Sequence, residues 1–122
     1  MTKLRVFEAF SGIGAQHMAL KNTNFDFEVV GTSEIDINAI IGYASIHYPD
    51  LQNILCPPRE VMINELSKLN IGYDFKKQKS TLDKIKLDKL EKLYKSTIVS
   101  KNLGDISLIN ENNIPSHDLL TY

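Results

Sequence analysis

The sequence predicts an α/β fold, an incomplete doubly wound parallel sheet with a helical insert. Residues 4–10 form a nearly continuous apolar run that leads through a glycine turn towards a helix. Unbroken apolar runs are typical of parallel strands covered on both faces. A second strand at residues 27–32 and a second helix at residues 35–48 follow, and alternation of strands with helices indicates a parallel sheet. The 122 residues are enough for one domain.

Each element has its own local signal. We expect the first helix to run from Gln16 to Lys21, directly after the glycines. The second helix is marked by apolar residues at helical spacing, namely Ile37, Ile40, Ile41, Ala44 and Tyr48. Pro49 helps to end it, because proline disfavours helix at the residue before it. Residues 102–106 indicate a short strand that meets a turn, and residues 118–122 begin another strand.

Residues 51–101 differ from the rest and are interpreted as a lysine-rich helical insert. One helix is expected from Pro57-Pro58 to about Leu69 and a second from Ser80 to about Ser96. Nine lysines and three acidic residues lie within 76–101, a net charge of +6 that leaves −7 for the remainder. The lysines either contact DNA phosphates or form a solvated face above the apolar stripe of Leu82, Ile85, Leu90 and Leu93.

Composition excludes several classes of protein. The single cysteine, Cys56, rules out an internal disulfide, and its position before Pro57 favours a structural thiol. His17, His47 and His117 share no metal-ligand spacing, so no metal site is predicted. The longest uncharged stretch, residues 37–49, is too short to span a membrane. Without a secretory signal at its start, the chain is expected in the cytoplasm.

The strongest candidate site is the turn Phe10-Ser11-Gly12-Ile13-Gly14 between a strand and a helix. Glycines permit a tight turn and a close approach of a ligand to the backbone. Glu34 follows Gly14 by twenty residues, at the end of the second strand. An acidic residue with that spacing accepts hydrogen bonds from ribose hydroxyls. His17 replaces the third glycine of the dinucleotide fingerprint, which argues against a dehydrogenase-type domain.

Four segments resemble the motifs of DNA (cytosine-5)-methyltransferases. Val6 to Ala15 is similar to their first motif, and Ser33 to Asp36, with the helix that follows, is similar to the second. Gly104-Asp105-Ile106 resembles the third, and Asp118 to Tyr122 resembles the strand that leads into the fourth. The resemblance implies the Rossmann-like fold of S-adenosylmethionine-dependent methyltransferases. It assigns residues 1–50 and 102–122 to the N-terminal part of the catalytic domain, with the insert at 51–101.

The resemblance also implies a cofactor, S-adenosylmethionine, and a role for each matching residue. Phe10 would pack against the adenosine end, and the turn of Ser11, Gly12, Ile13 and Gly14 would cradle the methionine part. Glu34 would hold both ribose hydroxyls, and Ile35 would lie on one adenine face. Asp105 would accept a hydrogen bond from the adenine amino group, with Ile106 beside the ring.

The catalytic motif of the family, Pro-Cys-Gln, would follow Tyr122 and is not in the sequence. In the family, its cysteine attacks carbon 6 of a flipped cytosine. We therefore assign no catalytic residue and expect no activity from this chain alone. The resemblance implies the N-terminal fragment of an enzyme, from a restriction-modification system or a phage, that methylates carbon 5 of cytosine in DNA. The alternative is a non-catalytic nucleotide-binding or partner-binding module, such as a subunit of a split methyltransferase.

Three kinds of partner follow from these interpretations. The complete enzyme would bind DNA, and a complementary C-terminal chain would supply the missing motifs. Self-association is expected through the open edge of the last strand, because unpaired strand edges pair with other chains. The apolar stripe of the insert offers a second route to self-association. No membrane partner is expected.

Overall fold

The computed structural model describes residues 3–51 and 53–122 of the chain. Its elements follow one another in the order β1 (Leu4–Ala9), α1 (Ala15–Lys21), β2 (Phe27–Ser33), α2 (Ile37–His47), α3 (Arg59–Lys68), β3 (Tyr73–Asp74), β4 (Lys79–Ser80), the 3-10 turn η1 (Leu82–Lys84), α4 (Leu87–Val99), the 3-10 turn η2 (Ile106–Leu108) and β5 (Leu119–Thr121).

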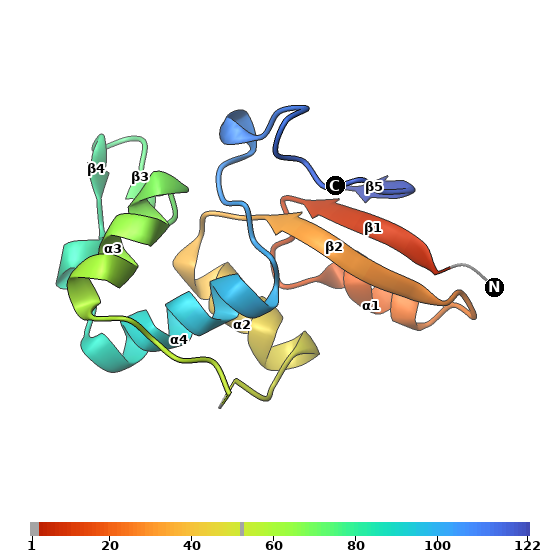
Figure 1. Cartoon of the computed structure of the whole chain (residues 1–122), viewed down its shortest axis with the longest axis horizontal. Helices are drawn as coiled ribbons and strands as arrows, with labels where there is room; N and C mark the ends of the chain where they lie inside the picture. The colour runs from red at the N-terminus through yellow and green to blue at the C-terminus, as the bar shows by residue number, and fades with distance from the viewer. Residues whose placement is uncertain (1–2, 52) are drawn as a thin grey trace.

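The main sheet has three parallel strands in the order β2-β1-β5. Leu4 pairs with Phe27 on one side of β1, and Val6 pairs with Leu119 on the other. In Figure 1 this sheet and both termini occupy one end of the molecule, while α3 and the β3–β4 hairpin occupy the other. Helices α2 and α4 lie between them. The predicted α/β class and parallel sheet are confirmed.

The two faces of β1 are covered differently. Successive side chains of a strand point to opposite faces of the sheet, so the side chains of Phe7 and Glu8 lie on opposite faces. Glu8 contacts His17 of α1 and Tyr43 of α2, both buried. Phe7 lies on the other face, where its ring packs against His117 with 5.8 Å between the centroids. The first face is therefore covered by helices and the second by the loop that precedes β5.

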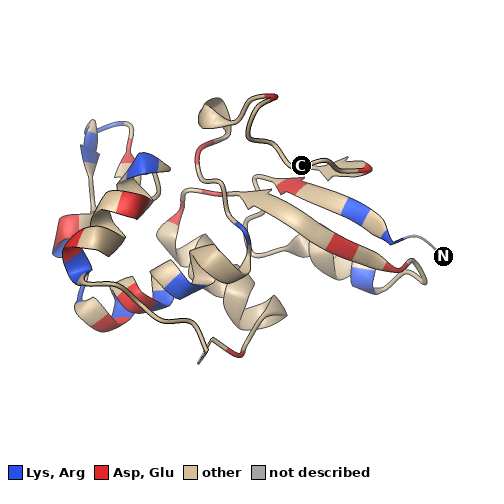
Figure 2. Cartoon of the chain, viewed as in Figure 1, with Lys and Arg blue, Asp and Glu red and all other residues tan. Residues whose placement is uncertain are grey.

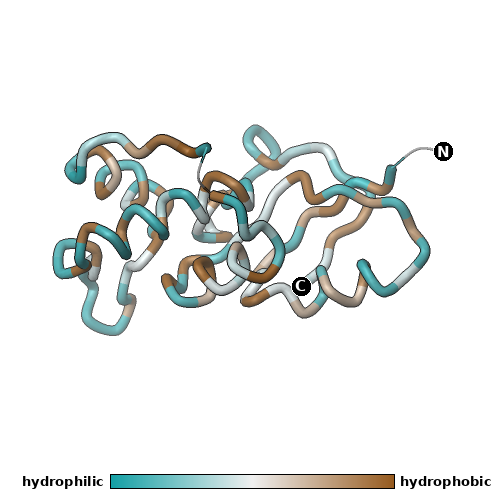
Figure 3. The backbone as a smooth tube through the Cα atoms, turned by 90° about the horizontal axis from the view of Figure 1, so that it is seen from below, coloured by the Kyte–Doolittle hydropathy of each residue, from teal (hydrophilic) through white to brown (hydrophobic). Residues whose placement is uncertain are grey.

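The insert shares one hydrophobic core with α2. Ile40 of α2 packs with buried residues of the insert, namely Met62, Leu66, Ile71, Leu82, Leu90 and Leu93. In Figure 3 the helices alternate between hydrophilic and hydrophobic residues along the backbone, as expected for helices with one buried face. Residues 51–101 thus depend on α2 for part of their own packing.

That core corrects the expected role of the apolar stripe. Leu82, Leu90 and Leu93 are completely buried within this chain, and Ile85 packs against them. The stripe is consequently not a surface for self-association. Amphipathic periodicity showed that one face would be covered, but it did not show that α2 and α3 cover it.

The second helix of the insert is also shorter than predicted. A continuous helix from Ser80 to Ser96 was expected, but the chain forms η1, becomes extended at Ile85 and Lys86, and starts α4 at Leu87. The Arg59 guanidinium donates hydrogen bonds to the Ile85 carbonyl at 2.6 Å and the Asp83 carbonyl at 3.2 Å. These two carbonyls bond to Arg59, and no local sequence signal reveals that partner.

Two further differences concern short strands. Residues 102–106 form only an isolated parallel bridge between Asn102 and Thr32, followed by η2, in place of the expected strand. Gly104 has φ +78° and turns the chain there. The β3–β4 hairpin was not predicted, because each of its strands has only two residues. Within the described residues, no helix is long and apolar enough to cross a membrane.

Candidate functional site

A small cleft lies where β1 and β2 end. Its volume is about 70 Å³, and it is lined by Phe10, Ser33, Glu34, Ile35, Gly104, Asp105 and Ile106. Five of these residues are predicted site residues, and they come from three separate segments of the chain. The carboxyl ends of parallel strands are where open α/β sheets bind ligands.

The glycine turn adjoins this cleft and contributes its first residue, Phe10, to the lining. Ser11 N–H donates to the Ser33 carbonyl at 3.1 Å, which ties the turn to the end of β2. Phe10 has φ +51° and a side chain that is 63% exposed. A bulky residue with positive φ is uncommon, and such strain clusters at binding sites. The turn therefore presents an exposed aromatic ring at the mouth of the cleft.

Gly14 is required by space as well as by conformation. Its φ is +88°, and a Cβ atom there would lie 2.1 Å from His47 Nε2 and 2.9 Å from the Tyr43 ring. His47 Nε2–H donates to the Ile13 carbonyl at 3.2 Å, so the imidazole cannot simply move away. Any side chain at position 14 would break the contact between the turn and α2.

Glu34 connects the turn to the start of α2. Gly12 N–H donates to Glu34 Oε1 at 2.9 Å, while Ile35 N–H and Asp36 N–H each donate to Oε2 at 3.0 Å. A carboxylate offers about four acceptor positions, and three are in use. About one position remains for a ligand hydroxyl. The predicted contact with both ribose hydroxyls remains a prediction, and it would require one backbone bond to be released.

Asn102 was missed by the sequence interpretation, although it holds the site together. Its Nδ2 donates to the Glu34 carbonyl at 3.0 Å, and its Oδ1 accepts from Glu34 N–H at 3.1 Å and from Gly104 N–H at 2.8 Å. Ser33 Oγ adds a bond to the Gly104 carbonyl at 2.7 Å. Glu34 and Asn102 are 68 residues apart in sequence, so their pairing leaves no local signal.

Asp105 is held in place by two neighbours. Its Oδ2 accepts from Asn70 Nδ2 at 2.9 Å, and its Oδ1 accepts from Ser107 N–H at 2.9 Å, which caps η2. The Asn70 hydrogen bond, with that of Ser107, lowers the pKa of the Asp105 carboxyl. These two hydrogen bonds leave about two acceptor positions of the Asp105 carboxylate unused. Its contact with an adenine amino group stays a prediction.

The four turn residues Ser11, Gly12, Ile13 and Gly14 lie beside the cleft and are not part of its lining. Ser11 is buried, whereas the Ile13 side chain is 58% exposed. Gly12 reaches the cleft only through its bond to Glu34. The structure thus brings Phe10, Glu34, Ile35, Asp105 and Ile106 together and leaves the other four turn residues outside the cleft.

A buried polar cluster beneath the turn was also missed. His17 Nδ1–H donates to the Tyr43 hydroxyl at 2.9 Å and Glu8 Oε2 at 3.3 Å, and Tyr43 in turn donates to Glu8. Burial raises the pKa of Tyr43 far above its ordinary range, and the bond to Glu8 raises it further. The His47 ring stacks on His17 with centroids 4.1 Å apart, and burial lowers its pKa.

One signal for part of this cluster was available. Tyr43 and His47 are four residues apart, which places them on one face of a helix. That spacing could have identified them as a pair, but Glu8 and His17 join them only in the folded chain. The cluster contains two histidines and one carboxylate, and within the described residues no group of three or more potential metal ligands is arranged to hold an ion.

Cys56 lies away from the cleft. Its side chain packs against the core of the insert, with Sγ 3.8 Å from the Glu91 carbonyl of α4. Burial raises the pKa of the thiol, which reduces the fraction present as nucleophilic thiolate. Both observations agree with a structural thiol.

Comparison with known proteins gives this arrangement a family. No protein-family model matches the chain. The type II methyltransferase M2.ScrFI of Lactococcus lactis subsp. cremoris is 38% identical over 98% of this chain and 34% of its own length. The orphan methyltransferase M.SssI of Spiroplasma monobiae is 35% identical over 98% of this chain and 33% of its own length.

The name of a third relative states the reaction that it catalyses. A DNA (cytosine-5)-methyltransferase of Dictyostelium discoideum is 42% identical over 43 residues, 35% of this chain and 11% of its own length. The chain spans about a third of the length of the two relatives that match nearly all of it. Because these likenesses agree with the motif order and the parallel sheet, the chain belongs to the DNA (cytosine-5)-methyltransferase family.

Proposed function

We propose that the chain supplies the adenosine-binding wall of a DNA (cytosine-5)-methyltransferase whose cofactor is S-adenosylmethionine. The observation that carries the proposal is the convergence of Phe10, Glu34 and Asp105 on one cleft at the end of a parallel sheet. These residues come from separate segments, and each lies in a motif of the family. Methyl transfer to carbon 5 of cytosine in DNA would then be the activity of the complete enzyme.

The lining of the cleft fits the adenosine end of the cofactor. Phe10, Ile35 and Ile106 offer apolar surface to a flat base, and Asp105 retains about two unused acceptor positions for an exocyclic amino group. Glu34 retains about one acceptor position for a ribose hydroxyl. Bound S-adenosylmethionine supplies the methyl group, while the residues of this chain bind and orient it.

The size of the cleft predicts weak binding by this chain alone. A cleft of about 70 Å³ is far smaller than the roughly 300–1,000 Å³ of ordinary ligand pockets. The relatives that match nearly the whole chain are about three times its length. In the complete enzyme, residues beyond those of this chain would supply further walls of the pocket. Ser11 to Gly14 would hold the methionine part only when those walls are present.

Cofactor binding can be tested by titration. S-adenosylmethionine at millimolar concentration should shift the amide resonances of Gly12, Glu34 and Asp105. Glu34→Ala should weaken binding by about 1.5–3 kcal/mol, because a hydrogen bond to a charged acceptor is lost. Glu28→Ala, at the other end of β2, is the matched control and should bind as the wild type does. Equal affinity of wild type and Glu34→Ala would remove Glu34 from the site.

The second candidate function is that of one subunit of a split methyltransferase. The observation that favours it is the outer edge of β5, which pairs with no strand in the described part of the chain. Co-expression with the C-terminal two-thirds of M2.ScrFI, assayed by tritium transfer to DNA, tests this function. Activity should need both chains and should survive Cys56→Ser. Tritium transfer by this chain alone that disappears in Cys56→Ser would overturn the assignment.

A further inference from the structure

The β3–β4 hairpin concentrates exposed positive charge in a fixed loop. Residues 75–79 read Phe-Lys-Lys-Gln-Lys, and all five are exposed. Asp74 Oδ1 accepts from Lys76 N–H at 2.9 Å and Lys77 N–H at 3.1 Å, so the backbone of the loop is held in one shape. Among the described residues, no ion pair involves the side chains of these lysines.

The lysines of η1 and α4 have different surroundings. Lys84, Lys89 and Lys92 are exposed, but Asp83, Asp88 and Glu91 alternate with them along the chain. Figure 2 shows this mixture of blue and red along α4, whereas blue predominates in β4 and the hairpin loop and red is confined to the β3 side of the hairpin. The hairpin loop therefore carries three lysines with no acidic residue among them.

The hairpin is anchored to the candidate cleft. Gly72 N–H donates to the Ile35 carbonyl at 2.9 Å, and Thr81 bonds to the Gly72 carbonyl through its N–H at 3.0 Å and its hydroxyl at 2.5 Å. Ile35 also lines the cleft that contains Glu34 and Asp105. The base of the hairpin is thus tied directly to a wall of the candidate cofactor site.

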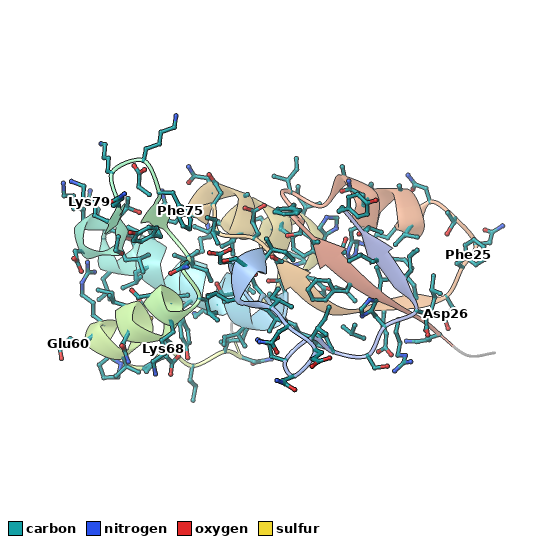
Figure 4. All side chains as sticks on the ribbon, turned by 90° about the horizontal axis from the view of Figure 1, so that it is seen from above. Phe25, Asp26, Glu60, Lys68, Phe75 and Lys79 are labelled. Carbon is teal, nitrogen blue, oxygen red and sulfur yellow. The ribbon has the colours of Figure 1, made fainter. Side chains whose placement is uncertain are left out.

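The hairpin also lies at the end of the molecule where a substrate would enter. In Figure 1 the arrowheads of β1 and β2 point towards the half that carries it. Figure 4 shows Phe75 and Lys79 at that end, with Phe25 and Asp26 of the α1–β2 loop at the opposite end. A second cleft of about 480 Å³ separates the hairpin from the start of α2, with Phe75 and Lys76 in its lining beside Ile35 and Asn38.

We propose that this hairpin contacts the phosphate backbone of the DNA substrate through Lys76, Lys77 and Lys79. The proposal rests on the proposed function, because it takes the substrate to be DNA. A duplex that delivers a base to the carboxyl end of the sheet brings its backbone past the hairpin, and exposed ammonium groups neutralise phosphates and release counterions. Three contacts of this kind give a slope of about −2.7 in a plot of log affinity against log salt concentration, or about a 40-fold loss between 50 and 200 mM salt.

Fluorescence anisotropy with a labelled 20-base-pair duplex tests the proposal on the 122-residue chain. K76Q/K77Q/K79Q should bind at least tenfold more weakly in 50 mM salt and lose most of the salt dependence. K84Q/K89Q/K92Q changes the net charge by the same amount and should bind within about twofold of wild type. The single variant K77Q, expected to reduce the slope by about 0.9, repeats the test should the triple variant fold poorly.

Several outcomes would overturn the proposal. These are equal weakening by both triple variants, full affinity in the hairpin variant, and no binding of DNA by the wild type in 20 mM salt. Tighter binding to an RNA duplex of the same sequence would assign the hairpin to RNA and would also overturn it. Cofactor titration of the same samples separates the two proposals: binding of S-adenosylmethionine with an inert hairpin refutes only the hairpin, and DNA binding through the hairpin without cofactor binding refutes only the proposed function.

Discussion

Gly12 and Glu34 are joined across the mouth of the candidate cleft, because Gly12 N–H donates to Glu34 Oε1 at 2.9 Å. The same carboxylate accepts from the two amides that follow it, those of Ile35 and Asp36, so one side chain fixes the glycine turn, the end of a strand and the approach to α2. A residue assigned to a ligand by its motif thus already has a structural task in the free chain.

Glu34→Gln should therefore destabilise the chain without any cofactor. The amide retains one acceptor oxygen and turns a donor towards backbone N–H groups, so we expect a loss of about 1–3 kcal/mol in the free energy of unfolding. Urea denaturation measures this loss, and hydrogen exchange should accelerate at Gly12. Glu28→Gln is the control. An unchanged unfolding curve for Glu34→Gln would show that the bond to Gly12 contributes nothing to stability.

Gly14→Ala should be more damaging than Gly12→Ala. Both positions have positive φ, but a Cβ at Gly14 would meet His47 Nε2 at 2.1 Å, whereas a Cβ at Gly12 has no neighbour closer than 4.0 Å. The shared conformational strain costs about 1 kcal/mol, and the overlap at position 14 adds about 1–3 kcal/mol. Thermal unfolding of the two variants compares them directly. Equal losses would mean that His47 moves aside freely.

The pKa of Asp105 gives a prediction about pH. Its hydrogen bond from Asn70 lowers that pKa below the value of about 3.9 in an unfolded chain. A lowered pKa stabilises the fold above the unfolded value, and the contribution is lost as the pH falls through the lowered folded value. The stability difference between wild type and Asp105→Asn should accordingly shrink in acid.

The assignment of that shift to Asn70 can be checked by carboxyl NMR titration. Asn70→Ala should raise the pKa of Asp105 towards its ordinary value. Asp118 is an internal control, since its pKa is lowered by hydrogen bonds from the backbone and side chain of Arg5 and should not respond. A pKa of Asp105 that is the same with and without Asn70 would contradict the assignment.

Association through β5 is now the remaining route to self-association. Leu120 is 46% exposed on this strand, and in the described part of the chain the strand has a partner only at β1. Open strand edges pair with other chains, and charged residues suppress this pairing. Sedimentation at micromolar concentration should show dimers or larger species, and Leu120→Lys should reduce them. A monomeric wild type would show that the edge is protected.

The sequence was informative where the signal is local. Apolar runs and helical spacing located β1, β2 and α2. The motifs identified Phe10, Glu34 and Asp105 as site residues, and all three line one cleft. It failed where a distant partner decides the structure. Arg59 bonds to the carbonyls at the interruption before α4. Where a strand was predicted, the Asn102 side chain instead accepts a hydrogen bond from Gly104 N–H. Glu8 meets His17 and Tyr43 only after α1 and α2 pack together.

Two hydrogen bonds between Glu34 and Asn102 hold the end of β2 beside the segment that carries Asp105. The two residues are 68 positions apart, yet each backbone group of Glu34 is paired with the Asn102 side chain. Between them, α2 is held to the glycine turn by His47, the insert is held to the cleft by Asn70 and Gly72, and the loops between these attachment points form shorter excursions. The entropy of closing such an excursion grows only slowly with its length. Changes in the length of these loops, such as the β3–β4 loop, can therefore alter what the segment contacts while the walls of the candidate cleft keep their positions.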